Sequence, residues 1–178
     1  MIRDFSVRAK HSNNKARALF IIFMVCSFLT VMLSALIAEY KGVFTLAGAV
    51  LLSVALLLYS KYIAPVYFYD VSADSAGVPL LIVRQQVGKR QSTLCRIALS
   101  DITKIEREDS KQRREHKTPQ DFRKYSYLPS LDPAVSYRIT TVNEYERAEI
   151  LIEISDEMAD LLRSYADEAN STAIDEEY

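Results

Sequence analysis

The stretch ALFIIFMVCSFLTVMLSALIA, residues 18–38, carries no charged side chain in 21 positions. After the four residues EYKG comes a second apolar stretch, VFTLAGAVLLSVALLLYSKYIA, residues 43–64, which has no charge before Lys61. At a rise of about 1.5 Å per residue, a helix as long as the first stretch reaches about 31 Å, the thickness of a hydrocarbon core. The two stretches therefore predict a hairpin of two transmembrane helices.

Two other interpretations of these stretches are less favourable. A soluble hairpin this apolar would have to be buried on all sides, and residues 65–178 form a partner too small for that. A cleaved signal peptide would have a shorter apolar run and a clear small-x-small cleavage site. In the transmembrane interpretation, Lys61 extends to the lipid–water interface and Tyr59 and Tyr62 lie in the interfacial belt.

The charges beside the hairpin predict its orientation. Residues 1–17 form a basic segment in which five bases face a single acid, Asp4, whereas the hairpin loop has one lysine and one glutamate. Excess Lys and Arg marks the cytoplasmic side of a membrane protein. We therefore expect a multi-pass protein of the cytoplasmic membrane with both termini in the cytoplasm. The five bases are Arg3, Arg8, Lys10, Lys15 and Arg17.

Small side chains in the second apolar stretch predict close helix packing. Gly48 and the small-xxx-small pair Ala49 and Ser53 would let another helix approach closely. That helix is either the first helix of the same hairpin or a helix of a second copy. No Asp, Glu, Arg or His lies in the core of either stretch, which argues against a proton or ion path and hence against a transporter.

Residues 65–170 predict one domain of strands and a terminal helix, followed by an acidic tail at 171–178. Pro65 ends the second helix, and alternating or β-branched apolar residues then indicate strands. A switch to helical spacing after Ser155 predicts an amphipathic helix with one apolar stripe that covers a sheet. The expected strands are 66–72, 80–87, 92–99, 100–106, 135–142 and 147–154. The expected stripe is Met158, Leu161, Leu162, Tyr165 and Ala169.

This organisation resembles that of bacterial membrane proteins with a pleckstrin-homology-like (PH-like) domain. The resemblance rests on the strand 80–84, the turn 88–90, the segment IALSDI at 97–102, the strand 150–154 and the helix 158–165. It implies an α+β membrane protein in which a transmembrane hairpin precedes a mainly antiparallel PH-like barrel. The barrel would have seven strands, one of them inside a long insert, and a C-terminal amphipathic helix would cap it.

The same resemblance implies binding or scaffolding, because the family has no common enzymatic activity. Eukaryotic relatives use bases in the first loop between strands to bind phosphoinositides. The corresponding loop here, residues 72–77, has no Lys or Arg, so this property is not expected.

The insert, residues 107–133, stands out by length and charge. Residues 104–124 hold eight bases and five acids, whereas the remainder of 65–178 carries a net charge of −9. The insert is either a solvated mixed-charge loop or short helix, or a contact for anionic headgroups or an acidic partner. Tyr125, Tyr127 and Leu128 would either hold it on the domain, which we favour, or anchor a partner. The candidate contact residues are Lys111, Arg113, Arg114, Lys117, Arg123 and Lys124.

No residue pattern in the chain indicates catalysis, a metal or a cofactor. Cys26 and Cys95 are far apart, His11 and His116 are isolated, and no phosphate-binding, zinc-binding or nucleophile motif occurs. The acidic domain has no basic face for nucleic acid. We therefore expect no enzyme, no cofactor and no nucleic-acid partner.

The sequence favours a membrane-anchored interaction or scaffolding module that acts through its cytoplasmic domain. Its partners would be the lipid bilayer and either another protein or a second copy of the chain. The alternative is a lipid-sensing or accessory subunit of a membrane complex that docks on the anionic inner leaflet.

Overall fold

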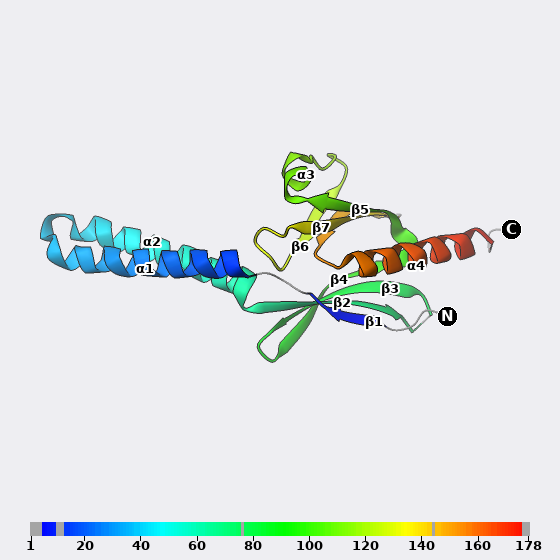
Figure 1. The fold of residues 1–178 in the computed structure, drawn as a ribbon, viewed down its shortest axis with the longest axis horizontal. Coiled ribbons are helices and arrows are strands. Elements are labelled where there is room, and N and C mark those ends of the chain that lie inside the picture. Colours follow the sequence, from blue (N-terminus) through cyan, green and yellow to red (C-terminus); the bar gives the residue numbers. More distant parts are fainter. Residues whose placement is uncertain (1–4, 10–12, 76, 144, 176–178) are drawn as a thin grey trace. The chain divides into compact units, whose positions relative to one another are not determined.

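A computed structural model describes residues 5–9, 13–75, 77–143 and 145–175 (Figure 1). The chain divides into two compact units. Residues 12–65 form a helical unit, and the residues before and after them form a second unit of strands and helices.

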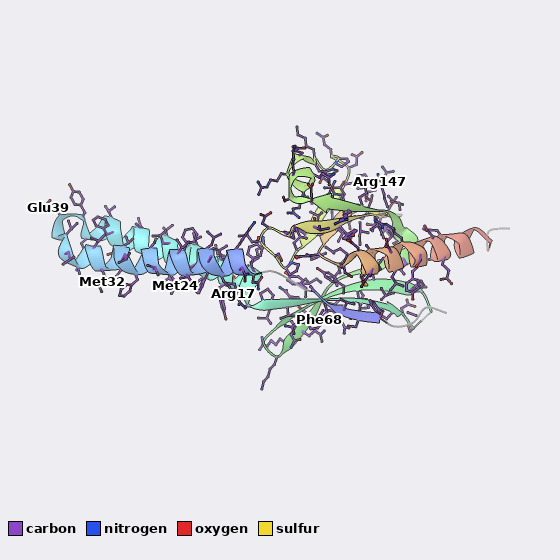
Figure 2. The ribbon with its side chains drawn as sticks, viewed as in Figure 1. Arg17, Met24, Met32, Glu39, Phe68 and Arg147 are labelled. Carbon is purple, nitrogen blue, oxygen red and sulfur yellow. The ribbon has the colours of Figure 1, made fainter. Side chains whose placement is uncertain are left out.

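The helical unit is a hairpin of α1 (Asn14–Leu36) and α2 (Lys41–Leu58). A 3-10 turn, η1 (Ala38–Tyr40), joins the two helices, and the π-helical turn η2 (Tyr59–Ile63) extends α2. Both helices are long and apolar enough to cross a membrane, as predicted, and only 11% of the most apolar window of each is buried. Met24 and Met32 project outward from α1 (Figure 2).

Gly48 lies at a close contact between α1 and α2. The Ser27 hydroxyl donates a hydrogen bond of 2.8 Å to the Gly48 carbonyl oxygen. A Cβ added at Gly48 would lie 2.8 Å from Cγ2 of Val31 and 3.4 Å from the Ser27 carbonyl oxygen. Ala49 and Ser53 are exposed on the hairpin, so they do not share this contact. Contact of that exposed pair with a second copy stays a prediction.

Replacing Gly48 by leucine is expected to destabilise the hairpin by about 1–3 kcal/mol, because the side chain overpacks the contact with Val31. Helicity of the full-length chain during titration with denaturing detergent measures this loss. Ala49→Leu is the matched control, since Ala49 is the exposed neighbour on the same helix. Equal effects of the two substitutions would contradict the close packing at Gly48.

The first sheet of the second unit has the strand order β1-β2-β3-β4. β1 (Phe5–Arg8) comes from the segment before α1 and pairs antiparallel with β2 (Pro65–Ala73), with Phe5 opposite Val71 and Arg8 opposite Phe68. β3 (Pro79–Val87) and β4 (Arg90–Ala98) form a hairpin around Gly88, whose φ of 60° favours glycine. The last three strands were predicted from the sequence, but no strand was predicted before α1.

The second sheet has the order β5-β7-β8-β6. β5 (Ile102–Asp109) follows the 3-10 turn η3 (Leu99–Asp101), and β7 (Val135–Val142) pairs antiparallel with both β5 and β8 (Arg147–Ile152). β6 (Arg123–Tyr127) lies inside the insert, where one strand was expected, and pairs with β8 in parallel. The insert also holds α3 (Ser110–Glu115).

The predicted PH-like barrel is wrong, because the strands form two separate four-stranded sheets that do not close. β4 ends at Ala98, and η3 turns the chain so that β5 pairs with β7 and not with β4. The edge position beside β8 is taken by the parallel strand β6. The coarser prediction of an α+β protein with a helical hairpin, antiparallel strands and a C-terminal helix is confirmed.

Both sheets and α4 (Asp156–Asp175) contribute to one apolar core. Met158 and Leu162 of the predicted stripe are buried, and Leu161, Tyr165 and Ala169 pack against the core. Tyr125 and Tyr127 also pack against it, in agreement with the expectation that they hold the insert on the domain. The fully buried core side chains of the two sheets include Tyr69, Val71, Leu81, Val83, Tyr137, Ile139 and Ile152.

Tyr69 links the two sheets through its hydroxyl group. The hydroxyl of this β2 residue donates to the Tyr127 carbonyl oxygen at 3.0 Å and accepts from the Glu153 N–H at 3.3 Å. Burial raises the pKa of Tyr69, so the hydroxyl keeps its proton for the first of these bonds.

Candidate functional site

The face of the second sheet opposite the core carries charged side chains. Tyr137 and Ile139 of β7 point into the core, so the alternation of a strand places Arg138 on the other face. The same argument applies to β8, where Glu149 lies between the core residues Ala148 and Ile150. This outer face is where α3 and the chain after it are attached.

Side-chain hydrogen bonds fix the position of α3. The Asp109 carboxylate accepts from the backbone N–H groups of Lys111 and Gln112, and the Gln112 side chain accepts from the Asp109 N–H, which completes a capping box. Arg113 reaches back to the chain at β7, where it donates to the Ser136 hydroxyl at 2.8 Å and to the Pro133 carbonyl oxygen at 3.0 Å. The helix therefore begins at a defined residue and is tied to the sheet.

Five side chains form a polar cluster: the buried Glu108, Arg138 and Glu149 and the half-buried His116 and Thr118. The Arg138 side chain is 1% exposed, and its Nη2 lies 2.6 Å from Glu108 Oε1, while its Nε lies 3.9 Å from Glu149 Oε2. His116 Nε2 lies 3.0 Å from Glu149 Oε1, and the Thr118 hydroxyl donates to Glu149 Oε2 at 2.8 Å. Two carboxylates thus lie within ion-pair distance of one buried guanidinium, although its Nε and Nη2 form no hydrogen bond of good geometry in the described chain.

The polar cluster holds Glu149 in its charged form. Burial by itself raises the pKa of Glu149, but the hydrogen bonds from Thr118 and His116 and the charge of Arg138 outweigh it and lower the pKa below its ordinary value of 4.5. A carboxyl group whose pKa is lower in the folded state stabilises the fold above its unfolded-state pKa. This contribution is lost as the pH falls below 4.5.

Replacing Glu149 by glutamine is expected to make the stability of the second unit less sensitive to acid. The wild-type free energy of unfolding should fall more steeply than that of Glu149→Gln between pH 4.5 and pH values below the lowered pKa. Denaturation of the full-length chain at a series of pH values measures both slopes. Glu157→Gln is the control, because Glu157 is exposed at the start of α4. Identical acid slopes for wild type and Glu149→Gln would contradict the prediction.

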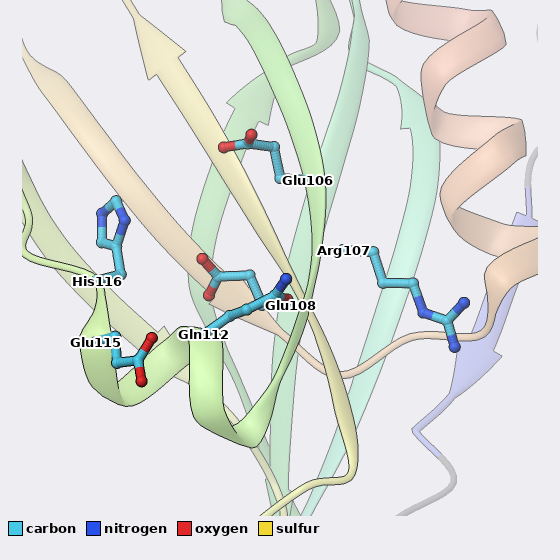
Figure 3. Close-up of a pocket in the computed structure, with 6 residues that line it drawn as sticks. All are labelled: Glu106, Arg107, Glu108, Gln112, Glu115 and His116. Carbon is cyan, nitrogen blue, oxygen red and sulfur yellow. The ribbon is translucent and has the colours of Figure 1, made fainter.

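A hollow of about 400 Å³ lies beside α3 and next to the polar cluster (Figure 3). The carboxylates of Glu106 and Glu108 and the ring of His116 lie on one side of β5, whereas the Arg107 side chain extends to the other side, toward Asp156 at 3.7 Å. The Glu108 side chain is 9% exposed, and its Oε2 is buried with no hydrogen-bond partner in the described chain. The lining residues are Glu106, Arg107, Glu108, Gln112, Glu115 and His116.

Carboxylates dominate the charged groups that line the hollow. Three of its six lining residues carry carboxylates, and each carboxylate also has a base within 4.0 Å: Glu106 near Lys104, Glu108 near Arg138 and Glu115 near Lys111. No group of three or more His, Cys, Asp or Glu side chains among the described residues has an arrangement that could hold a metal ion. Glu108 Oε2 and the Arg138 atoms Nε and Nη2 are buried without a hydrogen-bond partner in the described chain.

The structure places the six predicted contact bases in three different environments. Arg113 points toward the sheet and is 12% exposed, so its role is to hold α3. Lys111 and Arg114 are exposed on the same helix, and Lys117 is exposed just after it. Arg123 and Lys124 are exposed on β6. Three of the exposed bases have an acid within 4.0 Å: Lys111 near Glu115, Arg114 near Asp132 and Arg123 near Glu146.

Sequence reasoning missed the polar cluster. It considered His116 isolated, although the fold brings His116 to Glu149, 33 positions further along the chain. One available signal was a charged residue inside an otherwise apolar strand, as in Tyr137-Arg138-Ile139 and Ala148-Glu149-Ile150. Such residues belong on a solvent-exposed face unless another segment covers them, and the insert is that segment.

No protein-family model, curated protein or solved structure matches this chain. The similarity to PH-like membrane proteins therefore remains a resemblance in a few segments.

Proposed function

We propose that this protein is a membrane-anchored binding module that takes a cationic side chain of a protein partner into the hollow beside α3. The observation that carries the proposal is the acidic lining of the hollow, where Glu106, Glu108 and Glu115 contribute three carboxylates and the Arg107 side chain extends away from them. The module binds and does not catalyse.

In this proposal, the α1–α2 hairpin anchors the protein in the cytoplasmic membrane, with both termini in the cytoplasm. The pairing of β1 with β2 supports this topology. Residues 5–8 precede the hairpin and residues 68–71 follow it, so their pairing requires both ends of the hairpin on the same side of the membrane. The excess of bases in residues 1–17 favours the cytoplasm as that side.

A lysine or arginine side chain fits the hollow better than an anionic headgroup does. Glu106 and Glu115 flank the position of Glu108, and these carboxylates favour a cation over a phosphate. A bound cation would compete with Lys104 for Glu106 and with Lys111 for Glu115. Rim charges of this kind mainly set the association rate and the choice of partner.

Site-specific photo-crosslinking tests the proposal in the membrane of the protein's own host cell. A photoreactive residue at Gln112, which lines the hollow, is expected to give one discrete protein adduct. The same residue at Ser164, exposed on α4, is the control and should not give this adduct. Because every 1.4 kcal/mol changes affinity tenfold, losing two flanking charges in Glu106→Gln/Glu115→Gln should reduce the adduct by about tenfold.

A small competitor identifies the chemistry of the group that binds. N-acetylarginine amide at millimolar concentration is expected to reduce the adduct, whereas its neutral isostere N-acetylcitrulline amide should not. An adduct that persists in Glu106→Gln/Glu115→Gln and in the presence of the arginine compound would overturn the proposal. Both replaced residues are at least 44% exposed, so the variants keep the fold.

A further inference from the structure

The β3–β4 hairpin contains bases and no acids. Residues 75–100 include four bases, Arg84, Lys89, Arg90 and Arg96, although the chain from residue 65 onward has a net charge of −6. Arg84 pairs with Asp70 of β2. The other three are exposed and form no ion pair with the part of the chain that the structure describes. The turn of this hairpin therefore carries a local positive charge that no neighbouring acid compensates.

The turn lies at the end of the first sheet where the chain comes from the apolar helices. β3 runs back along β2, since Arg84 meets Asp70 and the Gln85 amide donates to the Tyr67 hydroxyl at 3.3 Å. β1 ends at the same level, because the Ala9 N–H donates to the Tyr67 carbonyl oxygen. Gln85 is therefore aligned with the first residues of β2, and the turn lies further along.

The length of the strands shows how far the turn extends. From Gln85 to Gly88 there are three residues, or about 10 Å at 3.3 Å per residue, whereas Tyr67 is only two residues, about 7 Å, from Pro65. Only Ala64 separates the end of η2 from Pro65, the first residue of β2. The chain therefore allows few residues between the apolar helices and this end of the sheet.

We propose that the turn of the β3–β4 hairpin, with Val87, Lys89 and Arg90, docks on acidic phospholipid headgroups of the leaflet from which the helices emerge. Val87 is 48% exposed next to the turn, so it adds an apolar side chain to the two bases. A base near an anionic leaflet is attracted to it over about a Debye length, so the contact should weaken with salt. The proposal rests on the hairpin α1–α2 being the membrane anchor.

This assignment differs from the one that the sequence suggested. The bases of the insert, which were the predicted headgroup contacts, include Arg113 in a structural role and three bases close to acids. Lys89, Arg90 and Arg96 have no such neighbours in the described chain.

Tryptophan fluorescence tests the proposal, because the chain has no tryptophan of its own. The full-length chain with Val87→Trp is reconstituted into vesicles of brominated phosphatidylcholine with or without phosphatidylglycerol. We expect about a twofold loss of tryptophan emission when phosphatidylglycerol is present, reversed by high salt. The matched control is Val78→Trp, which is also partly exposed but lies at the opposite end of β3, and it should not be quenched.

Charge reversal shows whether Lys89 and Arg90 cause the docking on acidic headgroups. Lys89→Glu/Arg90→Glu in the Val87→Trp chain should remove the effect of phosphatidylglycerol, whereas Arg147→Glu, exposed on β8, should not. Equal quenching of Val87→Trp and Val78→Trp, or quenching that survives the double reversal, would overturn the docking. Flotation of the vesicles in alkaline carbonate reports the anchor separately, so a chain that floats without quenching at Val87→Trp refutes the docking alone.

Discussion

Replacing Arg138 by methionine is expected to lower the free energy of unfolding of the second unit by about 3–5 kcal/mol. The Arg138 side chain is 1% exposed and is the cation between Glu108 and Glu149. Removing it leaves two carboxylates in a region that is largely closed to water. Methionine has a similar length and fills much of the space, so the loss of stability measures the effect of the missing charge and not that of a cavity.

Thermal and chemical denaturation of the full-length chain in detergent measure the effect of Arg138→Met. For a domain of this size, the expected loss corresponds to a fall in the unfolding midpoint of about 15 °C or more. Arg147→Met is the matched control, because Arg147 is an exposed arginine on the neighbouring strand β8. A midpoint for Arg138→Met close to that of Arg147→Met would show that the cluster does not stabilise the fold.

A triple variant separates loss of charge balance from loss of shape. Glu108→Gln/Glu149→Gln/Arg138→Met removes all three charges, and a neutral cluster of similar volume is expected to regain part of the stability. A triple variant less stable than Arg138→Met would mean that the carboxylates stabilise the fold through neighbours other than Arg138. The hydrogen bond from Thr118 to Glu149 is the first such contact to examine.

The parts of the fold that follow from local patterns were predictable from the sequence. The apolar helices and α4 each repeat their pattern over at least five turns, and six strands alternate or run apolar next to turn residues. β1 and β6 have neither signal, since they are only four and five residues long and mostly exposed. β1 pairs with β2 although the whole α1–α2 hairpin separates them in the sequence, and β6 pairs with β8 in parallel. Neither pair is joined by a short turn that would indicate it.

The candidate site depends on contacts that the local sequence does not encode. Glu108, Arg138 and Glu149 come from three strands, and only the register of the second sheet brings them together. His116 joins them because α3 is fixed by its capping box and by Arg113. The sequence located the insert as the segment of interest, but the side chains that it covers could be found only from the fold.

Replacing Val7 by proline is expected to destabilise the second unit by about 3 kcal/mol, whereas proline at the adjacent Ser6 should be tolerated. The difference follows from the ladder between β1 and β2. Ala9 N–H donates to the Tyr67 carbonyl oxygen, and antiparallel pairs alternate between bonded and non-bonded, so Val7 and Tyr69 form the next bonded pair. Ser6 and Asp70 form the non-bonded pair after Val7 and Tyr69, so Ser6 directs its N–H to the open edge of the sheet.

The expected cost for Val7→Pro has two sources. A buried carbonyl oxygen at Tyr69 loses its donor, at about 1–3 kcal/mol, and the packing of the Val7 side chain against the core is disturbed, at about 1–2 kcal/mol. Proline at an edge position whose N–H faces solvent loses no ladder bond. Ser6→Pro is therefore a control with the same residue, the same strand and the opposite N–H direction.

Denaturation of the full-length chain and limited proteolysis after Arg8 measure the two variants. Val7→Pro should unfold at lower denaturant and be cut faster at Arg8, because β1 detaches from Tyr69 and Val71. Equal behaviour of Val7→Pro and Ser6→Pro would refute the ladder. β1 precedes the helical hairpin in the sequence and β2 follows it, so their pairing supports a topology with both ends of the hairpin on one side of the membrane. Equal behaviour of the two variants would remove that support.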